Sequence, residues 1–133
     1  SMLVVLCNGC FDVLHIGHLW HLREARKMGH RLIVALTRDE HVGKGGGRPF
    51  YPFAERAAML AELRCVDKVI PANNAMEAIR TKRPTFFVKG IDYAGGDKFT
   101  EDVAAACKEV GAIIRYTATP KRSAADIVRK LQT

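Results

Sequence analysis

The fold is decided by the stretch Gly9-Cys10-Phe11-Asp12-Val13-Leu14-His15-Ile16-Gly17-His18, which follows the apolar run Leu3-Val4-Val5-Leu6. Its two histidines stand three residues apart, so they share one face where a helix begins. The first turn of a helix offers unpaired backbone N–H groups and the positive end of the helix dipole, both of which suit phosphate. The glycine between the histidines lets another group approach the backbone closely. An apolar strand, a glycine turn and paired histidines together predict a site for nucleotide phosphates.

Size and composition indicate one soluble globular domain. The chain has 133 residues, of which 48% are hydrophobic and 26% charged, and we predict a single domain over residues 2–133. No apolar run approaches the roughly 18 residues that span a membrane, and the apolar start is too short for a signal peptide. We therefore expect a cytoplasmic protein that has no membrane partner.

The formal net charge of +7 predicts attraction of anions. A solvated basic surface without a specific partner is the alternative interpretation. The sequence has neither the aromatic signature of RNA-binding domains nor a long basic tail. We therefore expect small phosphorylated ligands rather than nucleic acid.

The cysteines raise one further possibility. Cys7-Asn8-Gly9-Cys10 is a C-x-x-C sequence close to His15 and His18, a combination found in zinc sites and redox sites. The thiols lie much closer to the first histidine than in zinc fingers, and Cys7 ends an apolar strand, where a thiol behaves as a small hydrophobe. We therefore predict no metal-ligating residues and keep a zinc or redox protein as an alternative.

Apolar runs and helical patterns alternate along the chain. Strands are expected at residues 3–7, 31–37, 66–70 (ended by Pro71), 85–89 and 112–116, and helices at 17–28, 53–63, 75–82, 100–110 and 123–131. This order predicts an α/β fold with a mainly five-stranded parallel sheet between two helical layers. Ligands bind such sheets beyond the carboxyl ends of the strands, where residues 9–18, 37–56, 89–93 and 119–123 would meet.

The motif resembles the G-x-F-D-x-x-H-x-G-H pattern of the cytidylyltransferase-like nucleotidyltransferases, which share the HIGH motif with class I aminoacyl-tRNA synthetases. The resemblance implies a Rossmann-like three-layer sandwich. It also implies that His15 and His18 are catalytic and stabilise the transition state. The nucleotide would be bordered by further motif residues, namely Gly9, Cys10, Phe11, Asp12 and Gly17.

The glycine-rich stretch Lys44-Gly45-Gly46-Gly47-Arg48 is flanked by cations and is predicted to close over a triphosphate. It lacks the G-K-[ST] ending of a Walker A loop. The family resemblance implies that Lys44 is a catalytic contact to the phosphates. A flexible, solvated loop is the alternative interpretation.

Two arginine patterns point to different acceptors. Residues 48–56 resemble the R-P-x-x-P-x-x-x-R segment of heptose-phosphate adenylyltransferases, which implies that Arg48 and Arg56 bind the acceptor phosphate. A guanidinium suits that task because its fork matches phosphate geometry. Arg64, in Arg64-Cys65-Val66-Asp67, instead resembles the R-x-V-D of glycerol-phosphate and choline-phosphate cytidylyltransferases.

Two later segments complete the predicted nucleotide site. Val88-Lys89-Gly90-Ile91-Asp92-Tyr93 ends a strand and resembles the V-K-G-x-D-Y of the heptose branch. We expect Lys89, Gly90 and Asp92 to bind the nucleotide, Lys89 at a phosphate and Asp92 at the base or ribose. Ser123 is expected to cap the last helix and face the nucleotide. Residues 121–126 depart from the family, because alanines replace its run of hydroxyl residues.

The residues and the resemblance together predict an enzyme that joins a nucleoside triphosphate to a small phosphorylated sugar or polyol and releases pyrophosphate. A heptose 1-phosphate adenylyltransferase is favoured, and a glycerol-3-phosphate-type cytidylyltransferase is the alternative. A non-catalytic nucleotide sensor is a further alternative. Mg²⁺ is expected because it shields triphosphate charge. The resemblance also implies a homodimer.

Overall fold

A parallel sheet of five strands forms the centre of the protein, in the order β3-β2-β1-β4-β5. The structure is a computed structural model that describes residues 1–90, 98–118 and 129–132. The elements along the chain are β1 (Val4–Gly9), α1 (Ile16–Arg26), β2 (Arg31–Thr37), η1 (Asp39–His41), α2 (Phe53–Ala61), β3 (Lys68–Ala72), α3 (Ala75–Lys82), β4 (Phe86–Gly90), α4 (Lys98–Val110) and β5 (Ile113–Thr117). The predicted α/β class and parallel five-stranded sheet are confirmed.

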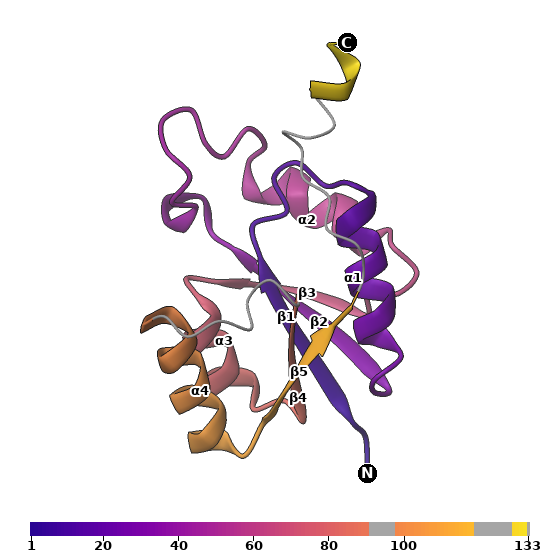
Figure 1. Cartoon of the computed structure of the whole chain (residues 1–133), viewed down its shortest axis with the longest axis vertical. Coiled ribbons are helices and arrows are strands. Elements are labelled where there is room, and N and C mark those ends of the chain that lie inside the picture. The colour runs from indigo at the N-terminus through magenta and orange to yellow at the C-terminus, as the bar shows by residue number, and fades with distance from the viewer. Residues whose placement is uncertain (91–97, 119–128, 133) are drawn as a thin grey trace.

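Helices cover both faces of the sheet because alternate strand residues point to opposite sides. Val5 and Cys7 face a buried cluster that includes residues of α1 and α2. Leu6, between them, faces a second cluster that includes residues of α3 and α4. Figure 1 shows α1 on one side of the sheet and α3 with α4 on the other. The three-layer architecture predicted from the alternation is therefore confirmed.

The direction of winding reverses at β1. From β1 the chain moves outward through β2 to β3, and it then returns to β1's other side through β4 and β5. Such a switch point leaves a crevice at the carboxyl ends of the two strands on either side of it. Here those strands are β1 and β4, so the segment after Gly9 and the segment after Gly90 end at the same crevice.

Strand β3 differs from the expectation. It covers Lys68–Ala72 and includes Pro71, whereas the sequence indicated a strand that Pro71 ends. The strand lies at the edge of the sheet, where a residue without an N–H group breaks no ladder on the open side. The expected last helix falls largely on residues 119–128, which lie outside the described part of the chain.

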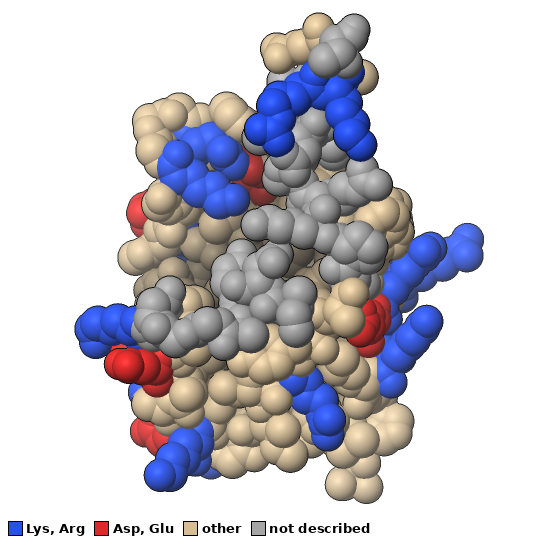
Figure 2. Space-filling view, in the orientation of Figure 1, with Lys and Arg blue, Asp and Glu red and all other residues tan. Residues whose placement is uncertain are grey.

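Within the described residues, no helix is long and apolar enough to cross a membrane. Figure 2 shows the Lys and Arg side chains of one face at several separate places, with Asp and Glu beside some of them. Among the residues drawn in colour, this face therefore presents no single continuous basic surface.

Candidate active site

The two motif histidines cap the first turn of α1. His15 is the N-cap residue, and its Nδ1 accepts a hydrogen bond from the backbone N–H of Gly17 at 3.1 Å. In return, the Nδ1 of His18 accepts from the backbone N–H of His15 at 3.1 Å. The two imidazoles thus form a reciprocal capping box, in which histidines replace the usual hydroxyl and carboxamide or carboxylate side chains. Their rings stack with centroids 3.9 Å apart.

This capping box fixes where each ring carries its proton. A ring nitrogen that accepts a hydrogen bond from an N–H group carries no proton of its own. We therefore assign the neutral Nε2–H tautomer to both His15 and His18. Each ring then offers one Nε2–H donor on the edge opposite the helix backbone, which is the edge a phosphate oxygen would meet.

Both histidines are neutral at pH 7. Burial, followed by electrostatic repulsion from the protonated forms of His15 and His21 and from Lys44, lowers the pKa of His18 to about 4. Burial and then Lys44 lower the pKa of His15 as well. The pair therefore acts through hydrogen bonds, and positive charge at the site must come from other residues.

The expected use of backbone N–H groups by phosphate changes in one respect. The N–H of Gly17 is occupied by His15, and the N–H of His18 donates to the carbonyl of His15 at 3.0 Å. At this helix start, these two backbone N–H groups are therefore already hydrogen-bonded within the chain.

Gly9 and Phe11 support His18 from the strand side. Phe11 is buried and its ring meets His18 edge-on, with centroids 5.0 Å apart. Its φ of 49° lies in the left-handed region, which is uncommon for a residue with a side chain. A Cβ added to Gly9 would lie 2.8 Å from Cε2 of Phe11. Glycine at position 9 therefore makes room for the ring that packs against His18.

Lys44 lies close enough to the histidine pair to affect both rings. Its charge contributes to the lowered pKa of His15 and of His18. The side chain is exposed, and its neighbours Gly43, Gly45, Gly46 and Gly47 have open space around them. Lys44 is therefore an exposed cation on an open loop, and its charge reaches both histidines.

Asp12 and Arg48 bind each other. The Asp12 carboxylate accepts from Nε of Arg48 at 2.9 Å, and Nη2 of Arg48 donates to the Asp12 carbonyl. The same carboxylate accepts from the backbone N–H groups of Phe50 and Tyr51. Burial alone would raise the pKa of Asp12, but these hydrogen bonds and Arg48 hold it below its usual value. The Asp12 carboxylate is thus hydrogen-bonded to residues 48–51 and is not exposed to solvent.

Arg56 is likewise engaged within the protein. Its side chain is 1% exposed. Nε donates to the carbonyl of Tyr51, and Nη1 donates to the carbonyls of Cys10 and Thr37, each at 2.9 Å. Nη2 pairs with Asp39 at 2.5 Å. The expected acceptor ligands Arg48 and Arg56 therefore lie beside the motif, and both hydrogen-bond to protein oxygens there.

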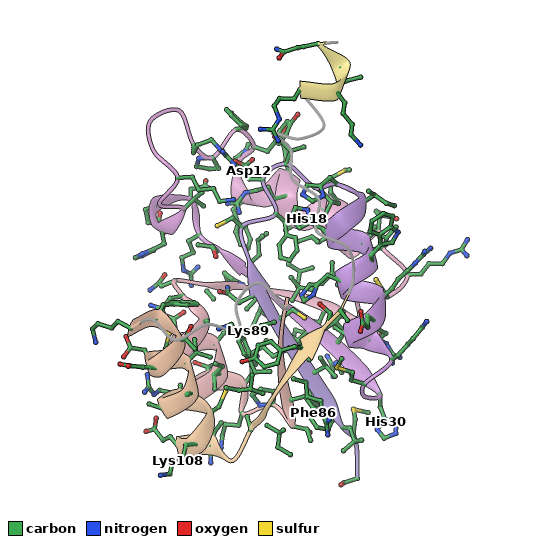
Figure 3. The ribbon with its side chains drawn as sticks, in the orientation of Figure 1. Asp12, His18, His30, Phe86, Lys89 and Lys108 are labelled. Atoms are coloured by element: carbon green, nitrogen blue, oxygen red, sulfur yellow. The ribbon has the colours of Figure 1, made fainter. Side chains whose placement is uncertain are left out.

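Lys89 and Gly90 end β4 at the crevice. Lys89 is buried, and its Nζ lies 5.3 Å from the ring centroid of Phe99 in α4. Figure 3 shows Asp12 and His18 near the start of α1 and Lys89 on the side of the sheet where α4 lies. The structure thus places Lys89 at the same end of the sheet as the histidines but toward the opposite helical layer.

Comparison with known proteins shows which family the chain belongs to. Residues 6–130 match the family model described as "Cytidylyltransferase-like". The chain belongs to the cytidylyltransferase-like family. Membership supports its assignment to the nucleotidyltransferases, the enzyme class that the motif predicted.

Curated relatives of this cytidylyltransferase-like chain are much longer than it is. It is 45% identical over 98 residues to "Bifunctional protein HldE" of Streptomyces coelicolor, covering 71% of this chain and 21% of the relative. It is 46% identical over 116 residues to the protein of the same name from Vibrio vulnificus, covering 80% and 24%. The chain therefore spans between a fifth and a quarter of these relatives.

Solved structures agree on the fold. The lipopolysaccharide core biosynthesis protein of Thermoplasma volcanium superposes with a TM-score of 0.76 at 26% identity, covering 91% of this chain and all of that one. A pantoate-beta-alanine ligase of Francisella tularensis superposes with a TM-score of 0.65 at 13% identity, covering 91% of this chain and 60% of that one. The second likeness concerns the fold alone.

One predicted residue, Arg64, lies away from the histidine pair of this cytidylyltransferase-like chain. Arg64 is exposed and lies between α2 and β3, at the amino end of that strand. The histidines lie at the carboxyl ends, so the fold separates Arg64 from them within one chain. Asp92 and Ser123, together with the altered residues 121–126, lie outside the described residues.

Residue-based reasoning missed His21, the next member of the histidine stripe. His21 Nδ1 and the Thr117 hydroxyl lie 2.6 Å apart, and Thr117 is buried at the end of β5. One turn further along α1, the Glu24 carboxylate accepts from the backbone N–H of Ala118. The spacing of three residues from His18 to His21 was the signal that could have identified this contact.

The cysteines and carboxylates do not form a metal cluster in the described part of the chain. Among residues 1–90, 98–118 and 129–132, no group of three or more His, Cys, Asp and Glu side chains is placed to hold a metal ion. Cys7 lies in the core, and burial raises the pKa of its thiol. A buried, protonated thiol suits packing better than metal binding or redox exchange.

Proposed function

We propose that this chain transfers a nucleotidyl group from a nucleoside triphosphate to the phosphate of a small phosphorylated sugar or polyol. The carrying observation is the reciprocal cap of His15 and His18, which holds two neutral Nε2–H donors next to each other. The cap lies at the switch point of the sheet, where α/β proteins bind nucleotides.

The chemistry requires little beyond positioned donors and positive charge. A phosphate oxygen of the acceptor attacks the α-phosphorus, and the bond from that phosphorus to the bridging oxygen breaks. Pyrophosphate leaves with the electron pair, and because both nucleophile and leaving group are anions, no general base is needed. The Nε2–H groups of His15 and His18 would donate to the oxygens on which charge increases, and Lys44 would approach the leaving phosphates.

Fixed neutral donors suit this task for a physical reason. An imidazole free to rotate must be ordered when the transition state forms, whereas these rings are already held by the backbone. A phosphate nearby favours protonation, but protonation of Nδ1 would break the cap. The rings therefore remain hydrogen-bond donors through the reaction.

The substrates remain part of the proposal. We favour a heptose 1-phosphate-type acceptor with ATP, because residues 48–56 and 88–93 carry the heptose-type patterns. The Thermoplasma volcanium likeness, a lipopolysaccharide core biosynthesis protein, supports the same direction. The R-x-V-D pattern at Arg64 supports glycerol 3-phosphate with CTP as the alternative.

We propose that Mg²⁺ binds to the nucleoside triphosphate rather than to the protein alone. Two described carboxylates beside the motif do not fit a protein-held Mg²⁺ site, because Asp12 accepts from Arg48 and two backbone N–H groups and Asp39 pairs with Arg56. Mg²⁺ would therefore arrive with the triphosphate, whose charge it shields. A homodimer, implied by the family resemblance, is checked by light scattering of the purified protein.

The test is a pyrophosphate-release screen of the purified chain with Mg²⁺. ATP, CTP, GTP and UTP are each combined with heptose 1-phosphate and with glycerol 3-phosphate. We expect one pair to give pyrophosphate and the matching nucleotidyl product. Nucleotide binding without pyrophosphate release from any pair would favour the sensor and contradict the proposal.

A further inference from the structure

The glycine-rich loop that carries Lys44 is held at its two ends. On one side Val42 is 4% exposed and anchors the loop in the protein. From Gly43 to Gly47 the chain meets little: Cβ atoms added to the four glycines would contact nothing within 4 Å, and φ is +95° at Gly45 and +77° at Gly47. A segment so free of contacts is positioned mainly by its anchors.

The second anchor is Asp12. Its side chain is fully buried, and Oδ2 accepts from Nε of Arg48 at 2.9 Å and from the N–H of Phe50 at 2.8 Å. Oδ1 accepts from the N–H of Tyr51 at 3.0 Å. Three donors from one short segment therefore converge on one carboxylate, and the segment begins at the residue where the glycine loop ends.

Arg56 ties the same segment to the ends of two strands. Its guanidinium joins the carbonyl of Tyr51 to the carbonyls of Cys10, after β1, and Thr37, at the end of β2. Asp12 and Arg56 thus hold residues 48–51 from two sides. Since Asp12 lies three residues before His15, the anchor and the histidine cap belong to one short stretch of chain.

We propose that Asp12 is a positioning residue for nucleotidyl transfer, which anchors the loop through Arg48 and so places Lys44 against the histidine pair and the triphosphate. The inference rests on the proposed function. It also assigns Arg48 to the loop anchor, whereas the family resemblance implied an acceptor-phosphate ligand.

Asp67 provides a matched control. Its Oδ2 lies 2.9 Å from Nε of Arg26 and accepts from the backbone N–H of Leu32 at 2.7 Å. This Asp–Arg pair has the same Nε–Oδ2 distance as the anchor but lies before β3, at the opposite end of the sheet. Asp67→Asn therefore reports the loss of an equivalent ion pair away from the site.

The first experiment, limited proteolysis, does not depend on enzymatic activity of the protein. Trypsin cleaves after Lys44, so the rate of cleavage there reports how firmly the loop is held. The carboxamide of Asp12→Asn has one acceptor oxygen where the carboxylate has two. We therefore expect this variant to be cleaved several-fold faster than both wild type and Asp67→Asn. Equal rates for the two variants would overturn the anchor.

The second readout is kinetic. Asp12→Asn and Arg48→Ala should each lower kcat/KM for the nucleoside triphosphate by roughly 10- to 100-fold, since small misplacement of a catalytic contact costs that much. Either substitution should have little further effect in a Lys44→Ala background, because the anchor acts through that lysine. Full additivity with Lys44→Ala would overturn the proposal, as would a loss confined to the acceptor KM in Arg48→Ala.

Thermal unfolding shows whether Asp12→Asn is folded and can be used in both experiments. If Asp12→Asn gives no cooperative transition, Arg48→Ala is used for both readouts, because the Arg48 side chain is itself partly exposed in wild type. A wild-type protein that releases no pyrophosphate with any substrate pair contradicts the proposed function, whereas the trypsin comparison still decides whether Asp12 holds the loop.

Discussion

A histidine that caps a helix gives one ring nitrogen to the backbone and keeps the other for a ligand. His15 and His18 do this for each other's turn, so their tautomer follows from helix geometry rather than from a neighbouring carboxylate. The spacing of three residues that makes them neighbours also makes the reciprocal bonds possible. At the residue scale, the HIGH motif is therefore both a structural cap and a pair of aligned donors.

The lowered pKa of His18 predicts how stability changes with pH. The unfolded state has the ordinary pKa of 6.5, whereas the folded value is about 4. Between these values the unfolded state binds more protons, so the free energy of unfolding falls as the pH is lowered from 6.5 toward 4. We expect His18→Asn, which keeps a capping acceptor but no titrating ring, to lose less stability over this range. Urea unfolding at several pH values measures this, and equal slopes for both proteins would contradict it.

At the element scale, the turn after β1 is shaped by the contact between Gly9 and Phe11. A methyl group at position 9 would push the Phe11 ring, which is buried against His18. We expect Gly9→Ala to lower the free energy of unfolding by about 1–3 kcal/mol, the usual cost of overpacking. Gly46→Ala, where an added Cβ meets nothing, is the control and should change it by less than about 0.5 kcal/mol. Urea denaturation checks both values, and similar losses for the two variants would be the contrary outcome.

Helix α1 is also joined to the end of β5, through His21 and Thr117. Thr117→Val removes the buried hydroxyl and leaves the His21 ring nitrogen without this partner. We expect a loss of about 1–3 kcal/mol in the free energy of unfolding. Thr81→Val removes an exposed hydroxyl that donates to the Glu77 carbonyl within α3, and it should cost about 0.5 kcal/mol or less. The same denaturation series separates the two, and a Thr117→Val protein as stable as wild type would contradict the contact's importance.

At the scale of the whole molecule, the alternation of apolar runs and helical patterns along the chain predicted the parallel sheet and its helical layers. Residues 31–37 and 75–82 were predicted with the bounds observed for β2 and α3, because continuous apolar burial defines one and the Asn74 cap begins the other. The proximity of His15 and His18 was also predictable, because residues three apart at a helix start are neighbours. Edge strand β3 was not, because a proline ends a strand only where its neighbours need the missing N–H.

The long-range contacts could not be predicted from single residues. Asp12 and Arg48 are separated by 36 positions, and Arg56 reaches the ends of two strands. Sequence patterns identified these arginines as cations beside phosphates, the commonest use of a guanidinium near a nucleotide motif. Only the path of the loop shows that both arginines also hydrogen-bond to protein oxygens.

Nucleotide binding at the switch point should stabilise the whole domain. A ligand that binds only the folded state at about 100 times its Kd adds roughly 2.7 kcal/mol to the free energy of unfolding. We expect the cognate nucleoside triphosphate to raise Tm with Mg²⁺ present and another triphosphate to raise it less. Differential scanning fluorimetry with ATP, CTP, GTP and UTP checks this, and no change with any of them would contradict the predicted site.

The most direct measurement is the initial rate of pyrophosphate release by His18→Asn, compared with His30→Asn. His30 lies at the far end of the sheet, and its Nδ1 also accepts a backbone N–H, from Leu3 at 2.8 Å. At both positions asparagine can keep an acceptor for the backbone N–H while it removes the Nε2–H donor, so the comparison isolates that donor of His18. The account predicts a loss of at least roughly 100-fold for His18→Asn and a nearly unchanged rate for His30→Asn. A His18→Asn protein that releases pyrophosphate as fast as wild type would contradict it.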